Sequence, residues 1–343
     1  MKKILFVLIL LISTYVSGQY IHFSQFYQTP LIINPALTGI FNGDHRVLIN
    51  YKDQWRSIGM PYKTFAISYD MALFKQKWEN IFLGAGFAVF RDKAGNSELG
   101  ITQLNLSLSG IFSINYNHKV SAGLQGGLAQ RSVNYSGLKW GNQFDGNLYD
   151  PNIDPGETFE PFIFPDFSAG LSWTYGTKAA TMSSFDELKL NAGVALYHIN
   201  RPKHEFDDVE KLYSRFVVHG GAYIGLKNSS IALVPSVLFL NQGPLVEVNL
   251  GTMVRYAIKE ESKYTHFVKE VAVLVGGYYR VGDAFIPGIL FEFANFAVGI
   301  SYDVNVSRLT VASSGKGGIE ISLRYIKPNP YRYGKGTKSA PML

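Results

Sequence analysis

Oxygen-bearing side chains are most concentrated between residues 145 and 157, where they could in principle bind calcium. The group consists of Asp145, Asn147, Asp150, Asp154 and Glu157. Oxygen ligands that lie close together in sequence can coordinate calcium. Their spacing does not match a calcium-loop template, however, and Asp and Asn beside Pro and Gly form turns without any metal. We therefore predict a turn-rich loop without bound metal, and keep calcium as the alternative.

Hydrolytic chemistry would require a nucleophile, a base and an orienting group that converge in space. The sequence has no Cys, which excludes thiol nucleophiles, disulfides and thiolate metal sites. Its seven His residues are scattered, and no Gly-x-Ser-x-Gly motif occurs. A Ser-based triad that forms only in the folded chain stays open as an alternative. The prediction is a protein without catalytic residues, metal or cofactor.

Alternation of polar and apolar residues is the clearest structural signal, and it is most regular over residues 103–110. Leu104, Leu106 and Leu108 alternate there with Gln103, Asn105, Ser107 and Ser109. Side chains on a strand point to opposite faces with a period of two, so one face of this strand is leucine and the other is small and polar. In an outer-membrane barrel the leucines would face lipid and the polar residues would face the lumen.

Similar segments recur along the whole chain, about fourteen in total. They cover residues 45–52, 62–73, 80–91, 101–115, 118–131, 164–175, 187–200, 213–224, 229–240, 244–257, 269–280, 283–292, 294–305 and 317–327. An even number of strands fits a closed barrel with both termini on the periplasmic side. The longest connection, 132–163, would then lie on the extracellular side, where long loops belong.

Composition supports a membrane barrel. Charged residues make up 17% of the chain, against about 25% in typical soluble domains. The net charge of +6 is too mild to indicate nucleic-acid binding. After the first twenty residues no apolar run approaches the length of a membrane helix. Because only helices and closed barrels satisfy their backbone in lipid, we predict an all-β fold, a transmembrane antiparallel barrel of outer-membrane type with an irregular N-terminal periplasmic lead.

The chain divides into four segments. Residues 1–18 have the charged, apolar and small-residue order of a secretory signal peptide, with Lys2 and Lys3 ahead of the apolar run. Residues 19–44 form the periplasmic lead or plug, and residues 45–327 the barrel. The final segment, 328–343, is basic and rich in Pro and Gly, so we predict a flexible tail.

Several short elements resemble the PorP/SprF family of outer-membrane proteins, which is associated with type IX secretion and gliding motility in Bacteroidota. The matching elements are Phe23-Ser24-Gln25-Phe26, Ile33-Asn34-Pro35-Ala36, Tyr51-Lys52-Asp53-Gln54-Trp55, Pro61-Tyr62-Lys63-Thr64, Trp140-Gly141-Asn142-Gln143, Asp150-Pro151-Asn152 and the final strand, 318–325. The resemblance spans nearly all of the chain after residue 18. The tail beyond Lys327 departs from the family, which usually ends near its last strand.

The resemblance implies a binding role rather than catalysis. The protein would bind, escort or anchor a large exported surface protein, an adhesin, through the adhesin's C-terminal region. It would also contact periplasmic motor or ring components and outer-membrane lipid, with no role for nucleic acid. The candidate partner-binding residues are Gln25, Phe26, Asn34 and Pro35 in the lead, then Trp55, Trp140, Asp150 and Pro151. The lead could act as a plug or as a docking segment, or it could merely close the bottom of the barrel.

A passive pore or a small-solute transporter is the main alternative function, because a barrel of this size can enclose a channel or a plugged lumen. The inward-facing charges predicted from the alternation are few: Lys189, Glu247, Glu320 and Arg324. They could line a channel, or they could brace a filled barrel from opposite walls. A pore would conduct without a protein partner, whereas a secretion component would form a stable complex with an exported protein.

Overall fold

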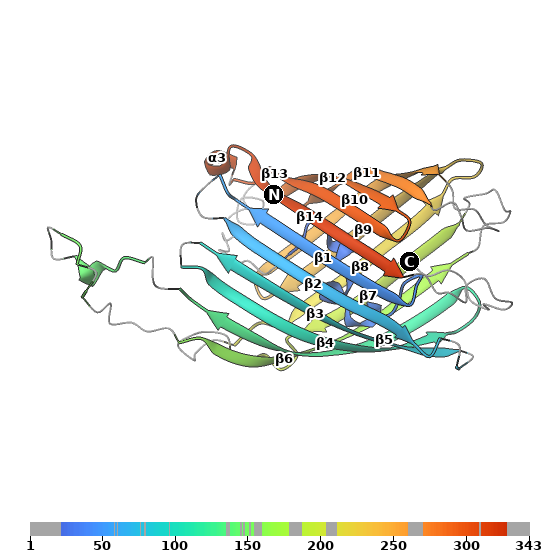
Figure 1. Cartoon of the computed structure of the whole chain (residues 1–343), viewed down its shortest axis with the longest axis horizontal. Coiled ribbons are helices and arrows are strands. Elements are labelled where there is room, and N and C mark those ends of the chain that lie inside the picture. The colour runs from blue at the N-terminus through green and yellow to red at the C-terminus, as the bar shows by residue number, and fades with distance from the viewer. Residues whose placement is uncertain are drawn as a thin grey trace, which may run out of the picture.

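The computed structural model is a closed barrel of fourteen antiparallel strands, shown in Figure 1. It describes residues 22–327 except 58, 60, 76, 79, 96, 135–137, 145, 147, 151, 154–159, 178–186, 204–210, 260–269 and 309. The predicted signal peptide, the predicted tail, Pro151 and most of the acidic cluster at 145–157 lie outside the described residues.

Each strand pairs with its neighbours in sequence, and β1 closes the barrel against β14. The strands are β1 (His45–Gln54), β2 (Tyr62–Leu73), β3 (Ile81–Ala94), β4 (Leu99–Ser113), β5 (His118–Ser132), β6 (Phe162–Gly176), β7 (Leu188–Tyr197), β8 (Arg215–Gly225), β9 (Ile231–Gln242), β10 (Leu245–Lys259), β11 (Val271–Arg280), β12 (Ala284–Phe293), β13 (Phe296–Asn305) and β14 (Lys316–Lys327). The predicted fold class and strand number are confirmed. Among the described residues, no helix combines the length and apolarity needed to cross a membrane.

The alternation in β4 has the predicted direction. Leu104, Leu106 and Leu108 are 46%, 63% and 67% exposed on the outer wall. Gln103 and Asn105, which alternate with them, are buried toward the lumen. Closure of the sheet leaves no unpaired edge, and the apolar outer face suits contact with lipid.

The two ends of the barrel differ. β1 ends, and β2 begins, at what we call the loop end, at the left in Figure 1. This end carries the connection 133–161 and the short helix α3 (Thr310–Ser313). β1 begins, and β14 ends, at the opposite end, which we call the base end.

The lead lies inside the lumen, where its residues bond the inner face of the wall. Its described part forms three short turns: η1 (Phe26–Gln28), α2 (Pro30–Ile33) and η2 (Pro35–Leu37). Pro30 and Pro35 each open a turn, where the missing N–H of proline is harmless. The lead starts near the loop end and reaches β1 at the base end, so it crosses the barrel lengthwise. Isolated turns this short are not stable alone, so contacts with the wall must hold them.

The lumen has a polar side and an apolar side. On β4, β5 and β6 the inward residues are mostly polar: Gln103, Asn105, Ser107, Ser109, Ser121, Gln125, Asp166, Ser168, Ser172 and Thr174. On β7 to β12 they are mostly apolar: Ala195, Tyr197, Val217, Leu238, Leu240, Met253, Leu274, Tyr278, Ile286 and Leu290. The second group packs with Phe26, Tyr27 and Ile33 of the lead. Strands of the apolar side therefore carry apolar residues on both faces, which obscures their alternation.

Candidate functional site

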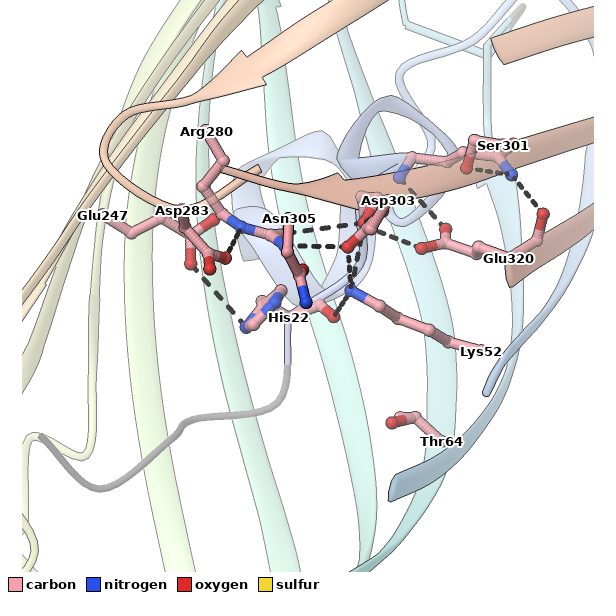
Figure 2. A network of polar contacts seen from close by, with 12 residues as sticks. His22, Lys52, Thr64, Glu247, Arg280, Asp283, Ser301, Asp303, Asn305 and Glu320 are labelled. Carbon is pink, nitrogen blue, oxygen red and sulfur yellow. Dashed lines mark hydrogen bonds and ion pairs between the residues drawn. The ribbon is translucent and has the colours of Figure 1, made fainter. Parts of the chain in front are cut away.

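A buried polar network, which we call the loop-end anchor, fixes the start of the lead (Figure 2). It joins Ser24 of the lead to Lys52 of β1, Arg280 of β11, Asp303 of β13 and Glu320 of β14. The Ser24 N–H donates to Glu320 Oε2 at 2.6 Å, and Ser24 Oγ donates to Asp303 Oδ1 at 2.6 Å. Lys52 Nζ donates to Ser24 Oγ at 3.0 Å. A single serine thus links the first strand of the barrel to the last two.

Asp303 is the electrostatic centre of this anchor. Its side chain is fully buried between two cations, with Oδ2 at 2.7 Å from Arg280 Nη2 and 3.4 Å from Lys52 Nζ. Arg280 Nε also bonds Asp283 Oδ2 at 2.6 Å. Buried charges are tolerated when they are paired and hydrogen-bonded, as these are. The network therefore acts as a clamp whose groups bond one another and the lead.

The next two lead residues extend the attachment to both sides of the lumen. The Gln25 N–H donates to Glu320 Oε1 at 3.0 Å, and Ser322 Oγ donates to Gln25 Oε1 at 2.6 Å. The Phe26 ring meets Tyr278 edge to face, with centroids 5.4 Å apart. Both side chains are almost fully buried, so their contacts are with the wall of the barrel.

Asn34 anchors the middle of the lead. Its Nδ2 donates to the Leu171 carbonyl at 3.0 Å and the Val194 carbonyl at 3.2 Å, and lies 3.0 Å from His219 Nε2. Its Oδ1 accepts the Ala36 N–H at 2.9 Å, which caps η2. The family-like Asn-Pro-Ala element therefore has a physical role, because the asparagine bonds three strands and starts the turn that follows it.

Glycines in the wall provide the seat for this element. They are Gly84 in β3, Gly123 in β5, Gly170 in β6 and Gly193 in β7. A Cβ added at Gly123 would lie 2.4 Å from the Pro35 carbonyl carbon, and one added at Gly170 would lie 2.0 Å from Asn34 Oδ1. The lead approaches the wall so closely that side chains at these positions would displace it.

A second cluster, the base-end anchor, holds the end of the lead. Asp70 of β2 accepts the Gly39 N–H at 2.8 Å and pairs with Arg46 of β1 through two bonds of 2.8 and 2.9 Å. Arg46 also lies over the Phe41 ring, 4.6 Å from its centroid. Lys75, in the turn after β2, donates to the Gly43 carbonyl. The lead is thus bonded at both ends and in the middle.

The charges predicted to face the lumen all have hydrogen-bond or ion-pair partners: Lys189, Glu247, Glu320 and Arg324. Arg324 Nη2 bonds Glu292 Oε1 at 2.7 Å, and Glu247 Oε2 lies 3.8 Å from His22 Nδ1 of the lead. Glu247 and Glu320 therefore contact the lead, whereas Lys189 and Arg324 pair within the wall, with Glu187 and Glu292.

The described part of the long connection, residues 138–144, 146, 148–150 and 152–153, forms an organised loop tip. Gln143 is its centre: its Oε1 accepts the Trp140 N–H at 3.1 Å, and its Nε2 donates to the Ile153 carbonyl at 2.8 Å. The Tyr149 hydroxyl donates to the same Oε1 at 3.2 Å. Among the described residues, no group of three His, Asp or Glu side chains could hold a metal ion. The calcium alternative rests on residues largely outside the described part.

The candidate residues named from sequence occupy three places. Gln25, Phe26, Asn34 and Pro35 lie together in the lumen. Trp55 lies at the loop end of β1, where its ring contacts Tyr62 edge to face at 5.2 Å. Trp140 and Asp150 lie in the loop tip, away from the lead, as Figure 1 shows for the green segment beyond the barrel. Sequence reasoning missed Arg46, Lys52, Asp70, Arg280 and Asp303; charged residues at inward strand positions were the available signal.

Fold and contacts define a membrane barrel whose lumen contains its own N-terminal lead. The chain belongs to the family of the type IX secretion system membrane protein PorP/SprF, whose model matches residues 16–325. The family and the barrel fold support an outer-membrane location and a role in type IX secretion. A comparison with curated proteins found no match.

Solved structures resemble this chain in fold alone. BamA from Haemophilus ducreyi lacking POTRA domains 1–3 has 11% identity and a TM-score of 0.44, with 83% of this chain and 70% of that chain covered. CdiB from Escherichia coli has 8% identity and a TM-score of 0.43, with 81% and 63% covered. A Pseudomonas aeruginosa FadL homologue has 11% identity and a TM-score of 0.42, with 85% and 92% covered.

Proposed function

We propose that this protein is a non-conducting outer-membrane barrel that binds and holds a large exported surface protein, such as an adhesin, at its loop end. The observation that carries the proposal is the lead, which is bonded along its length to strands on both sides of the β1–β14 seam. A lumen occupied in this way favours a scaffold over a passive pore. Family membership supplies the link to type IX secretion.

The loop tip is the surface we assign to the exported partner. Phe144 and Leu148 are 55% and 74% exposed there, while Gln143 holds the surrounding backbone. Exposed apolar side chains on an ordered loop suit contact with another protein. Trp140 and Asp150 belong to the same loop tip, so we include them in this surface. Periplasmic secretion or motility components would contact the base end.

In this proposal the four lead residues act indirectly. Gln25, Phe26, Asn34 and Pro35 are buried, so they would keep the plug seated rather than touch the exported protein. The loop end corresponds to the outside of the cell, because the longest connection emerges there. With the lead seated, the barrel would serve as a rigid base for the loops.

Affinity capture of the tagged full-length protein from its native outer membrane, followed by mass spectrometry, tests the proposal. We expect wild type to capture a large secreted protein in stoichiometric amounts. The double variant Phe144→Ser/Leu148→Ser should recover at least about tenfold less of that protein, since interface anchors often contribute about 2 kcal/mol or more. Val311→Ser is the matched control, because Val311 is 93% exposed at the same end outside the loop tip. Recovery of periplasmic components alone would contradict surface-protein binding. A protein that comes alone and conducts ions would establish the pore.

A further inference from the structure

A compact group of cations lies on the outer wall of the barrel at the loop end of β2 and β3. Lys63 pairs directly with Lys93 across the two strands, and Phe65 pairs with Arg91. Residues directly opposite in an antiparallel pair share a face, with Cβ atoms about 5 Å apart. Lys63 and Arg91 are exposed and Lys93 is partly exposed. All three side chains therefore project from one small area of the outer wall.

This area begins where the apolar outer wall stops. Moving along β3 toward the loop end, Phe87 and Val89 are followed by Arg91 and then Lys93 at successive outward positions. Leu104 and Leu106, on the neighbouring strand, face Val89 and Phe87. The outward residues thus change from apolar to cationic between Val89 and Arg91. Such a change is expected where the acyl chains of the membrane end and the headgroups begin.

The cations have few partners within the protein. Lys93 forms one solvent-exposed ion pair with Glu98 at 2.5 Å, which contributes little to stability. In the described part of the chain, Lys63 and Arg91 have no hydrogen-bond or ion-pair partner, although Asp53 lies opposite Lys63 on β1. Like charges placed directly opposite each other destabilise a sheet unless an anion compensates them. Glu98 pairs with Lys93 and also interacts with Arg91, so the three cations share one exposed carboxylate and the area keeps a net positive charge.

The base end of the same strands has no matching cluster. The outward positions of β2 and β3 there are apolar, with Met71 opposite Ala85 and Leu73 opposite Leu83. One further cation within the fourteen strands is exposed near the loop end: Lys316, the first residue of β14, which pairs with Val304 and lies two strands away from β2. The cluster therefore belongs to one leaflet and one sector of the barrel.

We propose that Lys63, Arg91 and Lys93 bind the phosphorylated headgroup of a glycolipid in the outer leaflet. Arginine binds a phosphate through two parallel hydrogen bonds, and two flanking ammonium groups neutralise its charge. The apolar outer wall next to the site accepts the acyl chains, which favours a lipid over free phosphate. A bound headgroup would remove the repulsion between the paired lysines. The barrel would then bind one class of lipid selectively at this place on its outer wall.

Native mass spectrometry of the purified full-length protein in detergent tests this site, with phosphorylated lipid A as the probe. We expect wild type to retain lipid A, and Lys63→Gln/Arg91→Gln/Lys93→Gln to bind it about a hundredfold more weakly, since each surface cation contributes about fivefold. The control Lys77→Gln/Lys227→Gln/Lys259→Gln removes the same charge from exposed lysines at the base end and should bind as wild type does. The single variant Arg91→Gln should lose about fivefold and provides the test if the triple variant does not fold.

Two further probes identify the source of the phosphate. Dephosphorylated lipid A should bind as weakly to wild type as lipid A binds to the triple variant. Inorganic phosphate at the same concentration should not displace lipid A. Three results would each overturn the proposal. The loop-end and base-end triple variants could lose lipid A binding equally, or the loop-end triple variant could bind lipid A as wild type does. Inorganic phosphate could also bind as tightly as lipid A.

Discussion

The two sides of the lumen hold the same lead by different means. On the polar side, directional bonds fix single atoms: Asn34 Nδ2 reaches the Leu171 carbonyl, and Ser121 Oγ donates to the Ala36 carbonyl at 2.8 Å. On the apolar side, Phe26 packs into a continuous cluster that has no such directionality. Hydrogen bonds constrain position, whereas apolar burial stabilises without specifying one arrangement. The polar side should therefore determine where the lead lies, and the apolar side should determine mainly how strongly it is held.

Breaking the loop-end anchor should have the largest effect. Arg280→Met leaves Asp303 buried with Lys52 as its remaining cation, and loss of one partner of a buried pair costs about 3–5 kcal/mol. The free energy of unfolding, measured with urea in detergent micelles, should fall by that amount. Adding Asp303→Asn to the same variant should recover part of the loss, since it removes the buried carboxylate that has lost the nearer of its two cations. A change of less than about 0.5 kcal/mol for Arg280→Met would show that the anchor is not stabilising, because changes of that size are typical of neutral surface sites.

On the apolar side, Phe26→Ala should reduce the free energy of unfolding by about 3 kcal/mol through lost burial and a residual cavity. Its consequence for position should differ from that of the anchor variants. Protection of the lead from proteolysis should persist, because the bonds of Asn34 remain. Phe144→Ala, at an exposed position in the loop tip, is the control and should have almost no effect on stability. If Phe26→Ala releases the lead as readily as Arg280→Met does, the distinction between directional bonds and apolar packing is wrong.

Crowding the glycine seat gives an intermediate effect that acts on position directly. Gly123→Ala places a methyl group against the Pro35 carbonyl, and overpacking of this kind costs about 1–3 kcal/mol. Amide hydrogen exchange over residues 30–40 should become faster while exchange in the strands stays slow. Gly220→Ala is the matched control, because an added Cβ there has its nearest contacts at an ordinary 3.6 Å. Equal exchange in the two variants would contradict a close approach of the lead to β5.

The smallest effect concerns pH. Burial of Lys75, in the turn after β2, lowers the pKa of its ammonium group to about 8, despite the opposing influence of Asp44 and Asp70. The unfolded chain therefore binds more protons than the folded chain between pH 8 and the ordinary lysine pKa of 10.5. Stability should rise with pH across this window, and Lys75→Met should remove that rise. The change in stability is measured from the urea midpoints of unfolding at pH 7 and pH 9.5. Lys77→Met, at an exposed position, is the control. An identical change of the midpoint with pH in Lys75→Met and wild type would exclude Lys75 as the cause.

The same difference between the two sides explains what could be predicted from sequence. In β4, polar and apolar faces alternate, so the strand, its direction and its lumen residues were all predictable. In β11 and β12, residues such as Leu274 and Ile286 face the lead while their neighbours face outward, and period-two alternation no longer separates inside from outside. Both segments were still predictable as strands from their length and β-branched content. Which of their residues face the lumen was not predictable.

The anchors were not predictable, because their members come together only when the barrel closes. Ser24 bonds Glu320, which lies 296 residues further along the chain, so no local spacing connects the two residues. The family-like elements pointed to Gln25, Asn34 and Pro35, which do lie in the lumen. Their hydrogen-bond partners depend on the strand register, which the sequence does not specify. The path of the lead through the lumen also depends on wall glycines, whose contacts with the lead exist only in the folded barrel.

If the lead seals the barrel, as we propose, the protein acts by binding and not by conduction. Single-channel recording of the full-length protein in planar bilayers tests it most directly, with Gly123→Ala/Gly170→Ala, which disturbs the seat of the lead, recorded beside it. We expect no stable conductance for wild type and intermittent openings for the variant. A steady, ohmic channel in wild type would contradict the account and identify the protein as a pore.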